Sequence, residues 1–344
     1  YANMVGNVPR LTQVRGGQGA GASATMPETT LYIPLQFWFC RNPGLALPLI
    51  ALQYHEVKIN LEFREAKQCY WSSTGSKYAT ETPSLKAASL YVDYIYLDTD
   101  ERRRFAQVSH EYLIEQLQFT GDESVNSSSN KIKLNFNHPV KELVWVVQPD
   151  SNIGDHDTRN VGGPQHFNYT DTIDASYYTG LPGDPLGDGL VGSGVGSTRL
   201  GDATDGTWLE AISAATGTHG AGANGVGGFV YDSGKNPVVS AKLQLNGHDR
   251  FSERGGRYFN LVQPYQHHEN IPSTGINVYS FGLTPEEHQP SGTCNMSRID
   301  NATLHLTLTP ESVAGNRSCK VRVYAVNYNV LRIMSGMGGL AYSN

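Results

Sequence analysis

The chain has 344 residues, of which 39% are hydrophobic and 17% are charged, and its formal net charge at pH 7 is −6. This apolar content allows a buried core, and no run approaches the roughly 18 consecutive apolar residues that a membrane-spanning helix needs. A mildly acidic chain is a poor candidate for a dedicated nucleic-acid-binding protein. The 37 glycines and the 10% of aromatic residues favour a protein of strands and loops over a helical bundle.

Three segments in the first hundred residues carry strand patterns. Residues 31–39 are rich in aromatic and aliphatic side chains, whereas residues 57–63 and 89–97 follow an alternating pattern. Alternation places one face of a strand in a core and the other face in water. Residues 42–44 (Asn-Pro-Gly) are typical of a turn, and the short apolar stretch 45–53 favours one or two helical turns.

A polar segment, residues 98–110, then interrupts the strand pattern and is predicted to be a connector with a short helical turn. Beyond this connector, strand patterns resume, and sustained helical periodicity is almost absent. We expect strands at residues 111–119, 131–136, 141–148, 239–245, 276–282, 303–308 and 319–331.

The composition changes sharply between residues 151 and 234. This stretch contains 19 of the 37 glycines, with ten acidic residues, two arginines and no lysine, so its net charge is −8. The remainder of the chain has 24 basic and 22 acidic residues, a net charge of +2. A loop of this length inside a compact domain is normally functional or disordered. We expect a partly ordered, Gly/Asp-rich surface insertion on a nearly neutral β scaffold.

A faint internal repeat links the two halves of the chain. Residues 35–39 precede residues 59–63 by 24 positions, and residues 279–283 precede residues 304–308 by 25 positions. Each pair is followed, after a polar loop, by a long aromatic strand. The pattern indicates the back half of one β unit followed by a complete second unit. It favours eight-strand jelly rolls, in which two sheets bury one face each.

Seven segments, in the same order along the chain, carry a family resemblance: residues 4–9, 33–52, 97–105, 136–143, 245–251, 290–301 and 324–332. By these segments the sequence resembles the major capsid proteins of nucleocytoplasmic large DNA viruses, a family found in algal, amoebal and iridovirus-like viruses. The resemblance implies an all-β fold of two jelly rolls, each an eight-strand β-sandwich, with the first only partly present. It implies no enzymatic activity, no cofactor and no metal.

The resemblance also implies a division of the chain. Residues 1–108 should hold the C-terminal half of jelly roll 1 and the connector, and residues 109–344 should hold jelly roll 2. The insertion at 151–234 should stand on the outer surface as part of a tower. Members of this family extend further at the N-terminus, so we expect the first strands of jelly roll 1 to be missing from this sequence.

The expected function is structural. The chain should form a homotrimer of pseudo-hexagonal outline, which builds an icosahedral shell with neighbouring capsomers and minor capsid proteins. We expect no direct contact with nucleic acid and no membrane span, a place in the virion shell, and assembly in the host cytoplasm. Large aromatic side chains are candidate packing or assembly anchors, namely Phe37, Trp38, Trp145 and Trp208.

One charged cluster lies in the connector. Its three arginines could contact phosphates, but three acidic residues directly precede or flank them, so the local charge nearly cancels. Interdomain salt bridges are the favoured interpretation for Asp98, Asp100, Glu101, Arg102, Arg103 and Arg104.

Five asparagines begin Asn-x-Ser/Thr triplets: Asn126, Asn168, Asn295, Asn301 and Asn316. The usual route of glycosylation requires passage through the secretory pathway, and no signal peptide is visible, so most of these triplets are interpreted as chance. The four cysteines, Cys40, Cys69, Cys294 and Cys319, do not form a CxxC metal pattern. We expect reduced and mostly buried thiols, although the sequence leaves one disulfide open.

Other functions have weaker support. Residues 267–269 (His-His-Glu) could ligate a metal, but neighbouring residues on a strand point to opposite faces and no second cluster follows. Residues 192–196 lack the Lys-Ser/Thr of a phosphate-binding loop. The main alternative is a jelly-roll carbohydrate-binding module, which would present coplanar exposed aromatic rings. A glycoside hydrolase would need two carboxylates placed across a cleft, and the sequence does not place them.

Overall fold

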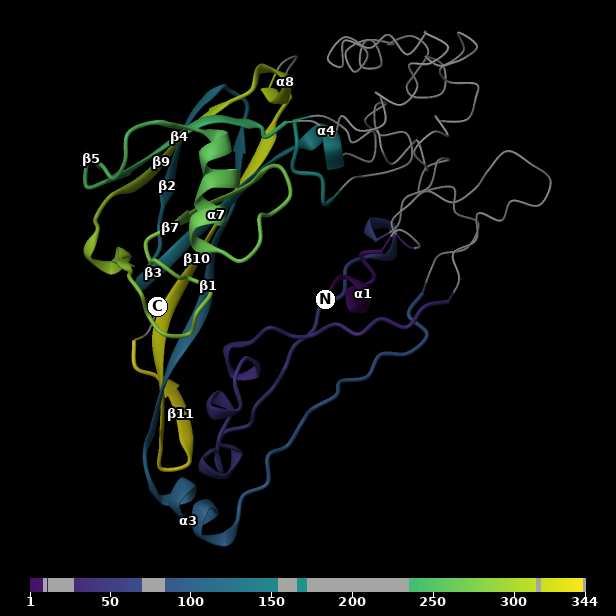
Figure 1. Cartoon of the computed structure of the whole chain (residues 1–344), viewed down its shortest axis with the longest axis vertical. Helices are drawn as coiled ribbons and strands as arrows, with labels where there is room; N and C mark the ends of the chain where they lie inside the picture. The colour runs from purple at the N-terminus through teal and green to yellow at the C-terminus, as the bar shows by residue number, and fades with distance from the viewer. Residues whose placement is uncertain are drawn as a thin grey trace, which may run out of the picture.

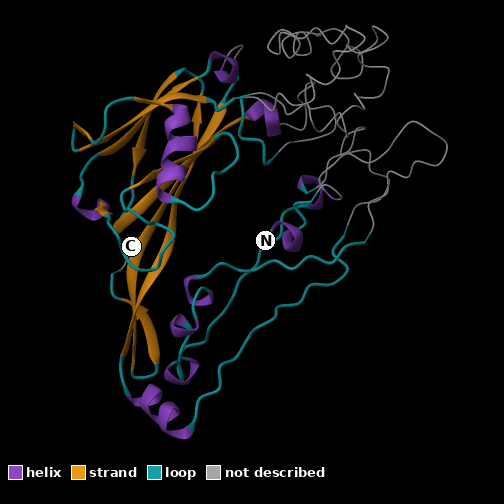
Figure 2. Cartoon of the chain, in the orientation of Figure 1, coloured by secondary structure: helices purple, strands orange, loops and turns teal. Residues whose placement is uncertain are grey.

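Two antiparallel sheets pack face to face in the C-terminal part of the chain (Figures 1 and 2). The computed structural model describes residues 1–8, 11, 28–69, 84–153, 166–171, 235–313 and 317–342. The larger sheet has six strands and the smaller sheet has five. This two-layer arrangement confirms the predicted all-β class.

The six-stranded sheet has the order β1 (His110–Val125), β10 (Cys319–Met334), β3 (Pro139–Pro149) and β7 (Ile276–Ser280). Two short strands extend it, because β11 (Met337–Leu340) pairs with β10 and β8 (Cys294–Asn295) pairs with β3. The five-stranded sheet has the order β2 (Ser129–Leu134), β9 (Ala302–Leu308), β4 (Val238–Leu245) and β5 (His248–Asp249), with β6 (Arg254–Gly255) on β4. All seven strands predicted after residue 110 are therefore confirmed.

The core lies between the two sheets and follows the alternation of the sequence. In β9 every second residue is buried, from Ala302 to Leu308, and the residues between them are half-buried. Facing them, Trp145 of β3 is fully buried and packs against Phe259 with ring centroids 5.1 Å apart. Burying one apolar face of each sheet is the main stabilising contribution in such a sandwich.

Among the described residues, helices are few and short. The connector forms α3 (Thr99–Gln107), which begins where the Asp98 carboxylate accepts a hydrogen bond from the backbone N–H of Glu101 at 2.8 Å. A π-helical turn, η8 (Tyr258–Val262), leads into α7 (Gln263–His267), which lies against the six-stranded sheet (Figure 1). The other helical segments are α1 (Ala2–Val5), η1 (Trp38–Cys40), η2 (Pro43–Leu45), η3 (Leu49–Ala51), η4 (Ala66–Gln68), α4 (Asp150–Ile153), η9 (Met296–Arg298) and α8 (Pro310–Val313).

The three strand predictions before residue 98 are wrong for this structure. Residues 57–63 and 89–97 are extended but form no ladder with any other described residue, and η1 interrupts the segment 31–39. Their apolar side chains are exposed, for example Leu61 at 54%. The alternation marks a face suited to burial, but a strand also needs a neighbouring backbone to hydrogen-bond with.

The insertion begins where β3 ends and finishes just before β4. Most of it, including Trp208, lies outside the described residues. Residues 151–153 belong to α4, and a second described part, residues 166–171, is fixed to the other end of the insertion. The backbone N–H of Asp171 donates to Lys235 O at 2.9 Å, and the Lys235 N–H donates to Asp171 Oδ1 at 2.8 Å. The base of the insertion is therefore closed by two hydrogen bonds.

The cysteines differ from expectation in burial. All four are free thiols, but Cys40 and Cys69 are exposed, Cys294 is half-buried, and Cys319 alone is buried. Burial raises the pKa of the Cys319 thiol to about 12, so this side chain behaves as a small apolar core residue.

Candidate functional site

The N-terminal segment lies beside β1, β10 and β11 at the end of the sheet that is nearest α3 (Figure 1). The backbone N–H of Tyr54 donates to Gly336 O at 2.9 Å, in the turn between β10 and β11. The Trp38 ring lies 5.9 Å from the ring of Tyr112 on β1, measured between centroids. This surface, where residues 28–69 meet the six-stranded sheet, is the contact between the two parts of the chain and is called the joining surface below.

A buried ionic network occupies the joining surface. Glu115 of β1 lies 2.8 Å from the Lys141 ammonium and 3.0 Å from the Arg41 guanidinium. The side chains of Glu115 and Lys141 are only 7% and 2% exposed. Arg41 also donates to the backbone O of Glu286 at 3.4 Å. One carboxylate thus holds a cation from its own sheet and a second cation from the N-terminal segment.

A β-bulge explains why Lys141 is buried in a polar setting. The pairing of β3 with β10 shifts between Val326 and Asn327, so that Lys141 has no partner in the ladder. A bulge of this kind turns a side chain away from regular alternation. The Lys141 ammonium lies 5.4 Å from the centroid of the Tyr328 ring, which supports the cation through its π face. Burial, together with the nearby Glu115, raises the pKa of Tyr328 to about 12.

A second polar pair lies next to this network. His268, directly after α7, is 2.8 Å from Glu142 of β3, and both side chains are 14% exposed. Its neighbour His267 hydrogen-bonds to Leu283 O through Nδ1 at 2.9 Å. The two histidines therefore have separate partners. Within the described ranges, no three His, Cys, Asp or Glu side chains lie close enough to hold a metal ion.

The predicted aromatic anchors lie in different environments. Trp145 belongs to the core of the sandwich. Trp38 is half-buried in η1, and its ring packs edge-on against Phe39 at 5.3 Å. Phe37 is 39% exposed and stacks on Phe39 at 5.0 Å. The structure thus brings Trp38 to the joining surface, where its ring lies near Tyr112, while Phe37 contacts Phe39 of its own segment.

The charged residues of the connector do not reach across to another part of the described chain. Asp98 caps α3, and Arg103 lies 3.9 Å from Asp100 within the same helix. The side chains of Arg103 and Asp100 are 66% and 93% exposed. The ion pair between the two parts of the chain is formed instead by Arg41 and Glu115, 74 residues apart, which sequence reasoning missed. One available signal was Lys141, which precedes the apolar run of β3, whereas Arg41 lies on no strand and offered none.

The Asn-x-Ser/Thr asparagines differ in accessibility. Asn126, Asn295 and Asn301 are exposed. Asn168 is 6% exposed, and its Oδ1 accepts hydrogen bonds from the N–H and the hydroxyl of Thr170. Asn316 lies outside the described residues. The interpretation of most of these triplets as chance occurrences stays a prediction.

The comparisons with known proteins bear on this architecture. A family described as large eukaryotic DNA virus major capsid protein matches residues 101–339, and one described as major capsid protein N-terminus matches residues 13–98. The major capsid protein of Phaeocystis pouchetii virus is 56% identical, across 100% of this chain and 74% of its own length. That of Chrysochromulina ericina virus is 52% identical, across 100% of this chain and 72% of its own length.

A solved structure agrees with the sequence comparisons. A chain of the PBCV-1 virus capsid, known as a quasi-atomic model, is 37% identical with a TM-score of 0.58, covering 95% of this chain and 74% of its own. The two packed sheets and this likeness define the class of protein, a capsid protein of the double jelly-roll fold. The chain belongs to the family of major capsid proteins of large eukaryotic DNA viruses, and its role is that of a structural subunit of the virion shell. Within the described ranges, no helix is long and apolar enough to cross a bilayer.

Proposed function

We propose that the chain trimerises into a pseudo-hexagonal capsomer, and that residues 1–108 and 109–344 belong to jelly roll 1 and jelly roll 2. The exposed apolar side chains of the extended segments carry this proposal. Val57, Leu61 and Phe63 alternate along one segment, and their exposed fractions are 44%, 54% and 59%. Contiguous apolar surface of this kind is typical of interfaces or of strands completed by another polypeptide. These extended segments accordingly gain their strand partners within the assembled capsomer.

The connector helix supports the proposed boundary between jelly roll 1 and jelly roll 2. α3 (Thr99–Gln107) begins where the matches of the two capsid families meet, because one match ends at residue 98 and the other begins at residue 101. The ionic network of the joining surface then fixes the orientation of one part against the other. A buried carboxylate with two cationic partners tolerates little displacement, because each ion loses its compensation when it moves.

The insertion is proposed to form the outer surface of the shell. It leaves the sandwich at the end of β3, the same end as the turn between β1 and β2 and as α8 (Figure 1). Its net charge of −8 suits contact with water better than contact with a neighbouring subunit. Minor capsid proteins as further partners, the absence of catalysis and assembly in the host cytoplasm belong to the same proposal. The carbohydrate-binding alternative lacks a specific observation in its favour, because Phe37 and Trp38 pack against Phe39.

Light scattering coupled to size exclusion tests the trimer. Purified full-length protein at micromolar concentration should elute at three times the mass of one chain, and electron microscopy should show particles of hexagonal outline. A single species with the mass of one chain, in protein shown to be folded by circular dichroism, would overturn the proposal.

A further inference from the structure

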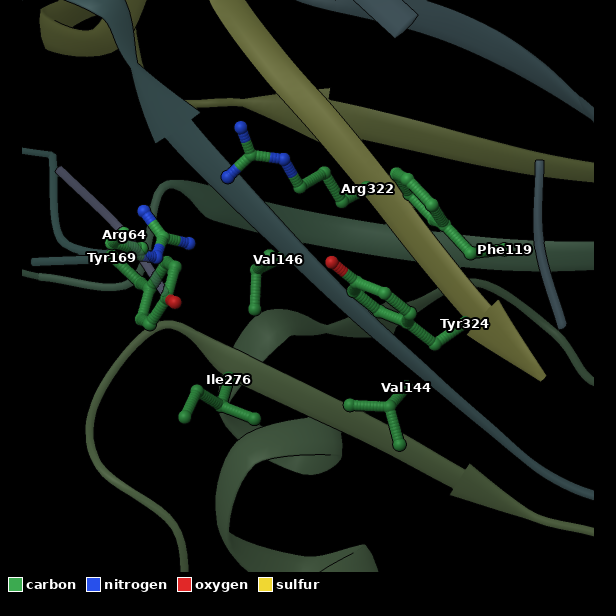
Figure 3. A pocket seen from close by; sticks show the side chains of 8 residues that line it. All are labelled: Arg64, Phe119, Val144, Val146, Tyr169, Ile276, Arg322 and Tyr324. Carbon is green, nitrogen blue, oxygen red and sulfur yellow. The ribbon is translucent and has the colours of Figure 1, made fainter. Parts of the chain in front are cut away.

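A cavity on the outer face of the six-stranded sheet has no assigned role. Its volume is about 420 Å³, and it is lined by Arg64, Phe119, Val144, Val146, Tyr169, Ile276, Arg322 and Tyr324 (Figure 3). The lining comes from the N-terminal segment, from four strands and from the base of the insertion. Volumes of this order are common for sites that hold small ligands or single side chains.

The floor of the cavity is apolar and the wall is aromatic. Val144 and Val146 lie on the face of β3 that points away from the core, beside Ile276 of β7. The rings of Phe119 and Tyr324 stack at 4.8 Å with an interplanar angle of 18°. A ligand seated here would therefore bury an apolar or aromatic body.

Three polar groups face the cavity without a partner among the described residues. Neither the Arg64 guanidinium nor the hydroxyls of Tyr169 and Tyr324 form a hydrogen bond or ion pair there, and Figure 3 shows the Tyr324 hydroxyl pointing toward the centre of the cavity. Burial raises the pKa of Tyr324, so its hydroxyl remains a hydrogen-bond donor at neutral pH.

The charge of Arg322, the other arginine of the cavity, is already balanced by a carboxylate. Arg322 donates to the two carboxylate oxygens of Asp122 at 2.8 and 3.1 Å, and to Gln148 Oε1 at 3.0 Å. Arg64 therefore supplies the one uncommitted positive charge among the described lining residues. A single cation over an apolar floor suits a single negative charge on an apolar body.

We propose that this cavity binds a carboxylate carried on an apolar or aromatic body. Arg64 pairs with the carboxylate, and the hydroxyls of Tyr324 and Tyr169 donate hydrogen bonds to it. The body lies on Val144, Val146 and Ile276. The carboxylate can come from an acidic side chain of a neighbouring polypeptide or from a free small molecule.

Titration of full-length protein with 4-phenylbutyrate tests the chemistry, with 4-phenylbutyramide as the uncharged probe. The carboxylate should bind at least about tenfold more tightly than the amide, as expected for a charge-assisted hydrogen bond. Arg64→Gln should remove this preference, whereas Arg332→Gln, which changes an exposed arginine paired with Glu111, should retain it. Equal binding of both probes, or an unchanged preference in Arg64→Gln, would overturn the proposal.

A high-resolution map of the purified particle distinguishes the two sources. Density in the cavity that continues into a polypeptide identifies a neighbouring chain, and isolated density identifies a free ligand. A cavity that holds neither contradicts the proposal. Because Arg64 has no partner in the described structure, Arg64→Gln should fold normally, and trimer formation by that variant separates loss of this site from loss of assembly.

Discussion

Glu115 and Glu111 lie on the same strand, and each forms an ion pair at 2.8 Å, but their surroundings differ. Glu115 and its partner Lys141 are 7% and 2% exposed, whereas Glu111 and Arg332 are 61% and 51% exposed. Removing one partner of a buried pair leaves a charge without compensation, and removing an exposed partner does not. The two residues therefore form a matched comparison.

Glu115→Gln should lower the free energy of unfolding by about 3–5 kcal/mol, because Lys141 and Arg41 then face each other without a carboxylate. Glu111→Gln should lower it by less than about 1 kcal/mol. Urea unfolding followed by far-UV circular dichroism measures both. Equal losses in the two variants would mean that the network contributes nothing beyond a surface ion pair.

Asp122 should contribute to stability in a pH-dependent way. The hydrogen bond from Arg322 is the main reason that the pKa of this carboxyl lies below its ordinary value of 3.8. The unfolded chain thus takes up this proton at a higher pH than the folded chain, and the contribution present at neutral pH is lost as the pH falls below about 4. Asp122→Asn should be less stable than the parent at pH 7. Its free energy of unfolding should also fall less steeply than that of the parent between pH 5 and about 2. Asp100→Asn, at a side chain that is 93% exposed, should follow the parent curve in urea unfolding across this range.

At the scale of elements, one glycine allows the base of the insertion to contact the backbone directly before β7. A Cβ on Gly275 would lie 2.0 Å from Tyr169 O, and its φ is +94°. Gly247 has a similar φ of +82° but no atom within 4 Å of its Cβ position. Comparing substitutions at these two glycines therefore distinguishes the effect of steric contact from the effect of backbone strain.

Gly275→Ala should destabilise the protein by roughly 2 kcal/mol more than Gly247→Ala, since both carry the strain of positive φ but only the first displaces backbone. Hydrogen–deuterium exchange should show faster exchange in residues 166–171 of Gly275→Ala alone. Similar exchange in the two variants would contradict the close contact at Tyr169.

The success of sequence prediction also differs between elements. Alternation predicted the strands of the sandwich because their apolar faces meet inside one chain, as Leu304 and Leu306 show. The same pattern failed at 57–63, where no described backbone completes a ladder. The helical stretch 258–267 was missed because only one or two turns carry its pattern, and Pro264 interrupts it.

The candidate site was hidden from sequence for a different reason. Arg41 and Glu115 are 74 residues apart, and a local pattern carries no information on such pairing. The bulge that turns Lys141 toward Glu115 depends on the register between β3 and β10, which only the folded sheet sets. Family resemblance supplied the fold and the structural role, but the residues that join the two parts of the chain required the structure.

At the scale of the whole molecule, the net negative charge is concentrated in the insertion. Outside residues 151–234 the chain is nearly neutral, with a net charge of +2, and the acidic insertion is attached to this scaffold. In the proposed capsomer, this division would separate the surfaces that pack against other subunits from a surface that suits water.

A near-atomic reconstruction of the purified particle tests this account most directly. It should show three copies of the chain in each capsomer, the sandwich of residues 110–340 in the shell, and density for residues 151–234 on the outer surface. A shell in which this chain is monomeric, or in which the insertion faces the interior, would contradict the account.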